Sequence, residues 1–189
     1  MKAVFFDRDG TLNEEVGYID SLSRFRLLPS ASHAVLEVNR AGLLAVVITN
    51  QSGVGRGLFP ETMVESIHEQ LRQELRHLGA HLDAIYYCPH HPDAEVLEYR
   101  MECTCRKPGT GMMEQAAERF GIRLEESFVI GDRLLDVQMA HRAGAGGILV
   151  RTGFGKEEWK LQGVDGTVNP DHIAENAYDA VQWILAGLK

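Results

Sequence analysis

The chain has 189 residues, of which 44% are hydrophobic and 24% charged, and its formal net charge is −8 at pH 7. This length fits one domain with a substantial core, and the acidic balance argues against nucleic-acid binding, which needs a basic face. No apolar run approaches the roughly 18 residues of a membrane span and no signal-peptide pattern is visible, so we expect a single cytoplasmic domain over residues 1–189 that binds neither nucleic acid nor membrane.

The first predicted strand ends in two carboxylates. The apolar run 3–6 is followed at once by Asp-Arg-Asp-Gly-Thr at positions 7–11. Side chains of a strand alternate faces with a period of two, so Asp7 and Asp9 point the same way and can serve one reacting centre. Gly10 lets the backbone turn closely around a ligand. Taken alone, the pattern is equally typical of an ordinary turn, in which Asp and Gly are common.

The remaining apolar runs alternate with helical patterns. They are continuous rather than alternating, as in parallel strands buried on both faces, and cover 43–49, 85–87, 128–130 and 148–150. Helices are expected over 30–41, 60–78, 110–120, 133–143 and 171–186. Histidines on these helices, such as His68, are interpreted as surface or packing residues. The alternation predicts an α/β fold with a doubly wound, mainly parallel sheet, whose ligands sit at the carboxyl ends of the strands.

Polar motifs follow three more of these strands. The second strand runs into Thr49 and a glycine-rich loop, in which backbone N–H groups can hold phosphoryl oxygens. Two cations, Arg106 and Lys107, stand in the segment after the third strand, and Asp132 follows the fourth. Each motif is weak alone, but four of them stand at predicted strand ends. The sequence therefore predicts one phosphate-handling site at that edge of the sheet.

The four motifs, in this order, resemble those of the haloacid-dehalogenase-like phosphotransferase superfamily over nearly the whole chain. The resemblance implies a Rossmann-like fold without a large cap domain, with Asp7 as nucleophile and Asp9 as general acid and base. It implies that Thr49 and Lys107 hold the phosphoryl oxygens. It also implies these Mg²⁺ ligands: the Asp7 carboxylate, the Asp9 backbone carbonyl and Asp132. Asp136, about one helical turn after Asp132, is expected to orient Lys107 or to cap the following helix.

All three cysteines fall in one segment, residues 88–107. Three thiolates and one imidazole make a complete tetrahedral shell, and soft sulfur ligands favour a structural Zn²⁺ over Mg²⁺. The candidate ligands are Cys88, His90, Cys103 and Cys105. His91 is an alternative to His90, and three reduced thiols or a Cys88–Cys103 disulfide are alternatives to the metal. Because Cys105 directly precedes Arg106 and Lys107, zinc would fix the loop that carries both cations.

Within the superfamily, the pattern is similar to that of the D-glycero-D-manno-heptose-1,7-bisphosphate 7-phosphatase family. The residues that carry the resemblance are the first motif at 7–13, Gly17-Tyr18, the glycine-rich loop at 49–57, Tyr-Tyr-Cys-Pro-His-His-Pro at 86–92 and Cys-Thr-Cys-Arg-Lys-Pro at 103–108. The resemblance implies hydrolysis of the 7-phosphate through an aspartyl-phosphate, in the synthesis of nucleotide-activated heptose for bacterial surface polysaccharide. It implies the following substrate-binding residues: Glu15, Val16, Gly17, Tyr18, Asn50, Gln51, Ser52, Arg106 and Arg133. Arg133 stands where that family often has Lys, which keeps the charge but changes the contact geometry.

Two other functions remain open at this point. Histidinol-phosphate phosphatases share the motifs and the zinc loop but accept a cationic amino alcohol, whereas the Gly17-Tyr18 loop, Ser52 and Arg56 favour a heptose. A second substrate phosphate is also better served by extra cations such as Arg106 and Arg133. A non-catalytic phosphosugar-binding protein can have the same fold, although the four retained motifs argue for an enzyme. We expect a monomer acting on a small phosphosugar, and the sequence does not specify the anomer.

Overall fold

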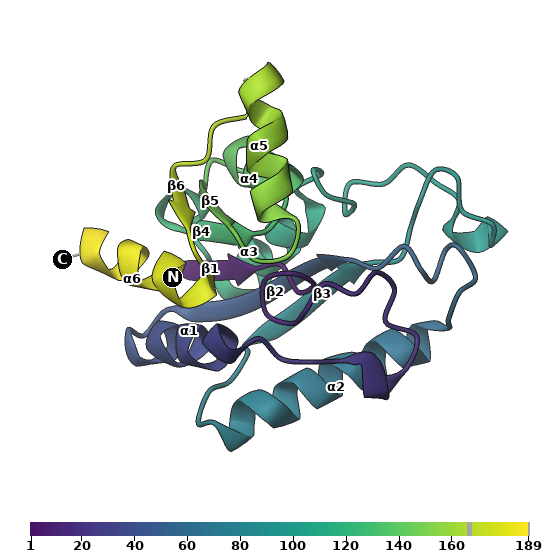
Figure 1. The fold of residues 1–189 in the computed structure, drawn as a ribbon, viewed down its shortest axis with the longest axis horizontal. Coiled ribbons are helices and arrows are strands. Elements are labelled where there is room, and N and C mark those ends of the chain that lie inside the picture. Colours follow the sequence, from purple (N-terminus) through teal and green to yellow (C-terminus); the bar gives the residue numbers. More distant parts are fainter. Residues whose placement is uncertain (166–167, 189) are drawn as a thin grey trace.

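The computed structural model, described for residues 1–165 and 168–188, contains one sheet of six parallel strands in the order β3-β2-β1-β4-β5-β6 (Figure 1). The strands are β1 (Ala3–Phe6), β2 (Leu44–Asn50), β3 (Ala84–Cys88), β4 (Phe128–Gly131), β5 (Gly146–Val150) and β6 (His172–Ala174). The chain runs outward from β1 to β3 and then returns to place β4 beside β1. The predicted doubly wound fold is confirmed, and its topological switch point lies between β1 and β4.

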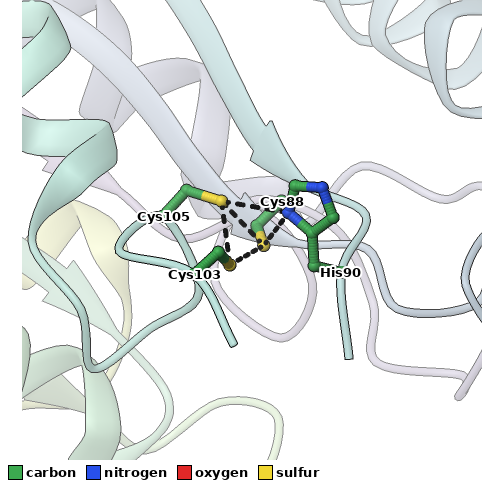
Figure 2. Close-up of side chains that lie close together, drawn as sticks. All are labelled: Cys88, His90, Cys103 and Cys105. Carbon is green, nitrogen blue, oxygen red and sulfur yellow. Dashed lines mark hydrogen bonds between the residues drawn. The ribbon is translucent and has the colours of Figure 1, made fainter. Parts of the chain in front are cut away.

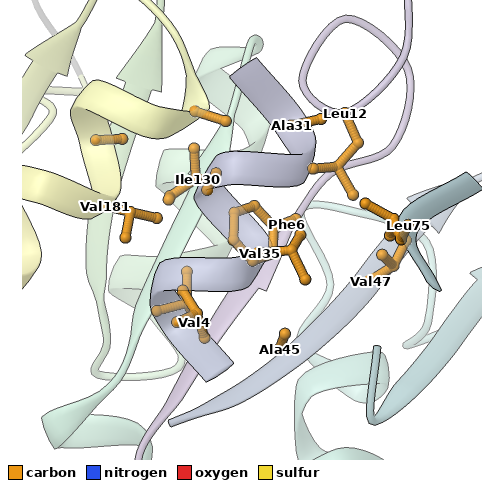
Figure 3. Close-up of a cluster of buried hydrophobic side chains, with 14 of the residues drawn as sticks. Val4, Phe6, Leu12, Ala31, Val35, Ala45, Val47, Leu75, Ile130 and Val181 are labelled. Atoms are coloured by element: carbon orange, nitrogen blue, oxygen red, sulfur yellow. The ribbon is translucent and has the colours of Figure 1, made fainter. Parts of the chain in front are cut away.

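Helices cover both faces of the sheet. One face packs against α1 (Pro29–Arg40), α2 (Glu61–His77) and α6 (Ala177–Gly187), and the other against α3 (Gly111–Phe120) and α4 (Leu134–Arg142). Val4 and Phe6 of β1 lie in the first core and Phe5 in the second, as alternation along a strand requires. Figure 3 shows Val4 and Phe6 beside Val35 of α1. Because β1 is fully buried between two cores, the residues directly after it have a rigid support.

The chain near the C-terminus differs from the prediction. Residues 171–186 were expected to form one helix, but they contain β6 and then α6, which starts after Asn176. The Asn176 side chain accepts hydrogen bonds from the N–H groups of Tyr178 and Asp179, which caps α6. Helix α5 (Gly155–Asp165) was not expected. The large apolar side chains in its described part, Trp159 and Leu161, are 39% and 69% exposed, and β6 is too short to give a periodic signal.

The connections at the carboxyl ends of the strands are loops rather than a separate cap. Residues 7–28 contain one short 3-10 turn, Leu22–Arg24, and residues 89–110 contain another, Leu97–Tyr99. Residues 51–60 form the third loop. Among the helices of the described residues, none has the length and apolar character needed to cross a membrane. The loops at 7–28, 51–60 and 89–110, together with the loop after β5, surround the switch point.

Candidate active site

A cavity of about 370 Å³ opens at the carboxyl ends of the strands. Asp7 follows β1 and Asp132 follows β4, the two strands that flank the switch point, while Thr49 stands near the end of β2. The cavity is lined by Asp7, Asp9, Glu15, Gly17, Tyr18, Thr49, Asn50, Gln51, Ser52, Arg106, Lys107, Asp132, Arg133, Leu135 and Phe154. Five segments distant in the sequence, at the carboxyl ends of β1 to β5, thus contribute to one cavity.

Lys107 lies buried between two carboxylates. Its Nζ is 2.9 Å from Asp7 Oδ1 and 2.6 Å from Asp136 Oδ1, and it donates to the Ile48 carbonyl at 3.3 Å. Burial by itself lowers the pKa of Lys107, but the charges of Asp136 and Asp7 outweigh it and raise that pKa above its usual range. A largely buried cation is therefore held beside Asp7 at the cavity.

Asp136 makes both of the contacts that were expected as alternatives, one with Lys107 and one at the start of α4. One carboxylate oxygen, Oδ1, pairs with Lys107, and the other, Oδ2, accepts the backbone N–H of Arg133 at 3.1 Å, which caps the start of α4. A Cβ at Gly131 would lie 2.3 Å from Asp136 Oδ2, so glycine is needed for this close approach. Both oxygens of Asp136 are thus engaged within the protein.

Three carboxylates form what we call the carboxylate cluster: Asp7, Asp132 and Asp136, whose ligand atoms lie within 4.8 Å of one another. Burial raises the pKa of Asp7 to about 7 even though Lys107 acts in the opposite direction. Burial and the charges of Asp7 and Asp136 raise the pKa of Asp132 to about 8. One lysine does not neutralise three acidic groups, and oxygen donors suit a hard divalent cation such as Mg²⁺.

Two glycines pack against the Asp132 carboxylate. Gly10 and Gly153 have φ angles of +77° and +52°, in the left-handed region, and a Cβ on either would lie 2.1 Å from Asp132 Oδ2. The N–H of Phe154 donates to the same oxygen at 2.8 Å, and the Thr152 hydroxyl donates to the Gly10 carbonyl at 2.6 Å. The loops after β1 and β5 therefore close around Asp132.

Asp9 is held by three side chains. Arg8 contacts both of its carboxylate oxygens, Asn13 Nδ2 donates to Oδ1 at 2.9 Å, and Gln51 Nε2 donates to Oδ2 at 2.8 Å. The same Gln51 nitrogen donates to Thr49 Oγ1 at 2.9 Å, so the loops after β1 and β2 are joined here. The Asp9 side chain is 18% exposed and lines the cavity. A carboxylate fixed in this way can exchange a proton with a molecule in the cavity.

Of the residues expected to bind substrate, Val16 alone is absent from the cavity lining. Its side chain packs against the first core, while its carbonyl accepts a hydrogen bond from Arg24 at 2.8 Å. Conversely, sequence reasoning missed Leu135 and Phe154. The Arg133 guanidinium lies 4.8 Å from the centroid of the Phe154 ring. The signal for Phe154 was its place between two glycines in the loop that follows the predicted strand at 148–150.

The cysteine cluster consists of Cys88, His90, Cys103 and Cys105, which converge as Figure 2 shows. Neighbouring ligand atoms are 3.1 to 3.7 Å apart. Ligands around a tetrahedral zinc with Zn–S bonds of about 2.3 Å would be separated by roughly 3.8 Å, so the cluster would accept one ion after its ligand atoms move apart by a few tenths of an ångström. All three thiols are free, and His91 instead accepts the N–H of Asp93. The cluster can therefore hold zinc through His90.

The cysteine cluster is joined directly to the cavity. The Arg106 side chain donates to the carbonyl of His90 at 3.2 Å, and Lys107 N donates to Asn50 Oδ1 at 3.0 Å. Asn50 Nδ2 returns a hydrogen bond to the Lys107 carbonyl at 3.4 Å. Closure of the cluster at Cys105 thus fixes the two residues that place cations in the cavity.

Comparison with known proteins agrees with this geometry. A family model described as HAD-hydrolase-like matches residues 104–180, and one described as polynucleotide kinase 3 phosphatase matches residues 2–141. The D-glycero-beta-D-manno-heptose-1,7-bisphosphate 7-phosphatase of Escherichia coli K12 is 39% identical over 98% of this chain and 89% of its own length. The D-glycero-D-manno-heptose-1,7-bisphosphate 7-phosphatase of Thermosynechococcus vestitus is 41% identical over 98% and 96%.

Among solved structures, that of the D,D-heptose 1,7-bisphosphate phosphatase of B. bronchiseptica, complexed with magnesium and phosphate, has a TM-score of 0.87. Its sequence is 32% identical, and the match covers 99% of each chain. The likeness therefore extends over the sheet, the loops around the cavity and the cysteine segment together.

Proposed function

Since the chain belongs to the haloacid-dehalogenase-like phosphatases, within the D-glycero-D-manno-heptose-1,7-bisphosphate 7-phosphatase family, we propose that it hydrolyses the 7-phosphate of this bisphosphate. The observation that carries the proposal is the buried ion pair of Lys107 with Asp7 at the base of a cavity. A carboxylate can approach a phosphate dianion only where cations neutralise the repulsion.

In the first step, a carboxylate oxygen of Asp7 attacks phosphorus. The bond between phosphorus and the C7 oxygen breaks, and Asp9 gives its proton to the leaving oxygen. The products are the dephosphorylated sugar and an aspartyl-phosphate on Asp7. Thr49 and Lys107 hold the phosphoryl oxygens, for which their places in the cavity lining are suited.

In the second step, a water molecule attacks the phosphorus of the aspartyl-phosphate. Asp9, now a carboxylate, accepts the proton of that water, and the bond between phosphorus and the Asp7 oxygen breaks. Inorganic phosphate leaves and Asp7 is regenerated. The hydrogen bonds from Asn13 and Gln51 keep Asp9 in one place for both steps.

We assign Mg²⁺ to Asp7, Asp132 and the backbone carbonyl of Asp9. An ion bound there would neutralise phosphoryl charge. Asp136 is excluded from this set because both of its oxygens already have partners. We assign a structural Zn²⁺ to the cysteine cluster, where it would fix Arg106 and Lys107.

The walls of the cavity fit a bisphosphorylated sugar. Arg106 and Arg133 supply cations beyond Lys107 for the second phosphate, while Glu15, Tyr18 and Ser52 offer hydrogen-bond groups to sugar hydroxyls. Val16 contributes by holding the loop at residues 15–18 against the core. We further propose that the protein acts as a single-domain cytoplasmic monomer in the synthesis of nucleotide-activated heptose. Free thiols suit that compartment.

The proposal is tested by comparing kcat/KM on both anomers of heptose 1,7-bisphosphate with that on histidinol phosphate and on a 3′-phosphorylated oligonucleotide. We expect the heptose to be preferred by at least about 100-fold, since losing buried polar or charged contacts costs several kcal/mol. The oligonucleotide arm is included because of the second family model. Preference for either of the other substrates would overturn the assigned substrate but leave the phosphatase mechanism standing.

A further inference from the structure

Arg8, which stands between the two carboxylates of the first motif, is the largest of the fully buried side chains, at 1% exposure. A guanidinium keeps its charge when buried and therefore needs several hydrogen-bond partners. Arg8 is absent from the cavity lining, in contrast to Arg106, Lys107 and Arg133. It is therefore not placed to bind a phosphate of the substrate.

One edge of the Arg8 guanidinium, formed by Nε and NH2, contacts the Asp9 carboxylate. NH2 lies 2.9 Å from Oδ2 and 3.0 Å from Oδ1, and Nε lies 3.2 Å from Oδ1. Such a fork fixes the plane of a carboxylate as well as its position, which a single ammonium does not do. The contacts from Asn13 and Gln51 each reach only one oxygen of Asp9.

The opposite side of the guanidinium is held by His68 of α2. NH1 of Arg8 lies 3.2 Å from His68 Nε2, and the His68 ring packs edge-on against Tyr87, with centroids 5.6 Å apart. Nε2 can accept this hydrogen bond only when the imidazole is neutral. Burial, together with the charge of Arg8, lowers the pKa of His68 to about 2, so the acceptor form persists at physiological pH.

We propose that Arg8, braced by His68, is a positioning residue that sets the Asp9 carboxylate in line for proton transfer to the leaving oxygen. This inference rests on the proposed role of Asp9 as general acid. An Asp side chain has two freely rotating bonds, and small misplacements of a catalytic group cost large factors in rate. A bidentate partner that never touches the substrate removes that freedom.

The test uses a series of substituted phenyl phosphates, from 4-nitrophenyl to unsubstituted phenyl phosphate, with kcat/KM as the readout. For an enzyme with a covalent intermediate, kcat/KM reports the step that expels the leaving group. A weakly basic nitrophenolate departs without a proton, whereas a more basic leaving group needs the general acid. Asp9→Asn is therefore expected to lose about 100-fold or more on phenyl phosphate and much less on 4-nitrophenyl phosphate.

Arg8→Lys keeps the charge but removes the fork. We expect a loss of about tenfold on phenyl phosphate, against less than about threefold on 4-nitrophenyl phosphate. Ile67→Ala, which removes core packing next to His68 on the same helix, is the matched control. It should lower the thermal stability and leave the ratio between the two substrates unchanged.

A second measurement covers the case in which Arg8→Lys folds poorly. In Arg8→Ala, added methylguanidinium should restore turnover of phenyl phosphate more than that of 4-nitrophenyl phosphate. Equal losses on both substrates in Arg8→Lys, or equal rescue in Arg8→Ala, would overturn the inference while leaving the proposed function intact. An Asp9→Asn variant with the leaving-group dependence of the unmodified enzyme would overturn the general-acid role itself, and this inference with it.

Discussion

The carboxylate cluster and the cysteine cluster each gather ligand atoms within 4.8 Å of one another at the same end of the sheet. Asp7 and Asp132 line the cavity, whereas no cysteine does. The first cluster offers hard oxygen donors with raised carboxyl pKa values, and the second offers a closed shell of three sulfurs and one nitrogen. An ion that meets substrate needs an open position, whereas an ion that only holds a loop does not. The carboxylate cluster is therefore suited to the reaction itself, and the cysteine cluster to holding a loop in place.

The largest effect is expected from Asp7→Asn, which removes the proposed nucleophile. Turnover of heptose bisphosphate should fall by more than about 10⁴-fold, as for nucleophiles in other covalent mechanisms. The measurement is Mg²⁺-dependent phosphate release, with zinc content determined in parallel. Because the cysteine cluster is independent of Asp7, its zinc content should stay unchanged. Persistent turnover would refute the covalent mechanism.

The next effect concerns pH. Mg²⁺ binds the charged forms of Asp7 and Asp132, whose pKa values without metal lie at about 7 and about 8. As pH falls through this range, protons compete with the ion, so Mg²⁺ affinity should drop, by on the order of 10²-fold between about pH 8 and about pH 6. Titration calorimetry with Mg²⁺ alone would measure this. A pH-independent affinity would place the ion away from these carboxylates.

Cys105→Ala tests whether the cysteine cluster holds the loop in place. Loss of zinc should free the loop that places Arg106 and Lys107, and activity should fall by about 10- to 100-fold, as for groups that orient a site. Mg²⁺ binding should persist, because the carboxylates remain in place. Turnover at the original rate in a zinc-free preparation would mean that the loop holds its shape unaided. Cys105→Ser offers a control with a similar volume.

The smallest effect is expected for Asp136→Asn, which tests whether this member of the carboxylate cluster binds Mg²⁺. Lys107 would lose one of its two ionic partners, so kcat should fall by about tenfold. Since Asp136 is not assigned as a metal ligand, Mg²⁺ affinity should change by less than about threefold. The two quantities are measured on the same preparation. A large loss of Mg²⁺ affinity would instead place Asp136 among the metal ligands.

The sequence predicted the parts of this molecule that depend on local pattern. β1 and β2 are buried on both faces, so their apolar runs and the polar residues that end them were visible without a structure. The described apolar side chains of α5, Trp159 and Leu161, are exposed, and β6 has only three residues, so neither element produced a periodic signal. The choice of His90 over His91 depends on where a loop turns, which adjacent residues in a sequence do not reveal.

Contacts between residues far apart in the sequence could not be predicted from local pattern. Arg8 reads as an ordinary polar residue of a turn, and His68 as one position on a helix, although the two meet in the interior. Phe154 reaches the cavity because the loop after β5 folds over Asp132. Val16 was expected among the substrate residues through its neighbours in the chain, but its side chain turns toward the core. Tertiary packing, rather than local propensity, decides each of these positions.

The separation of Asp7 from Asp132 along the chain has a consequence for biosynthesis. Asp7 leaves the ribosome early, yet β4 must dock beside β1 before Asp132 reaches it. Cys88 and Cys105 are only 17 residues apart, so their loop closes at a smaller entropic cost. A nascent chain can therefore close the cysteine loop well before its phosphatase centre is complete, and a product truncated ahead of β4 would be inactive.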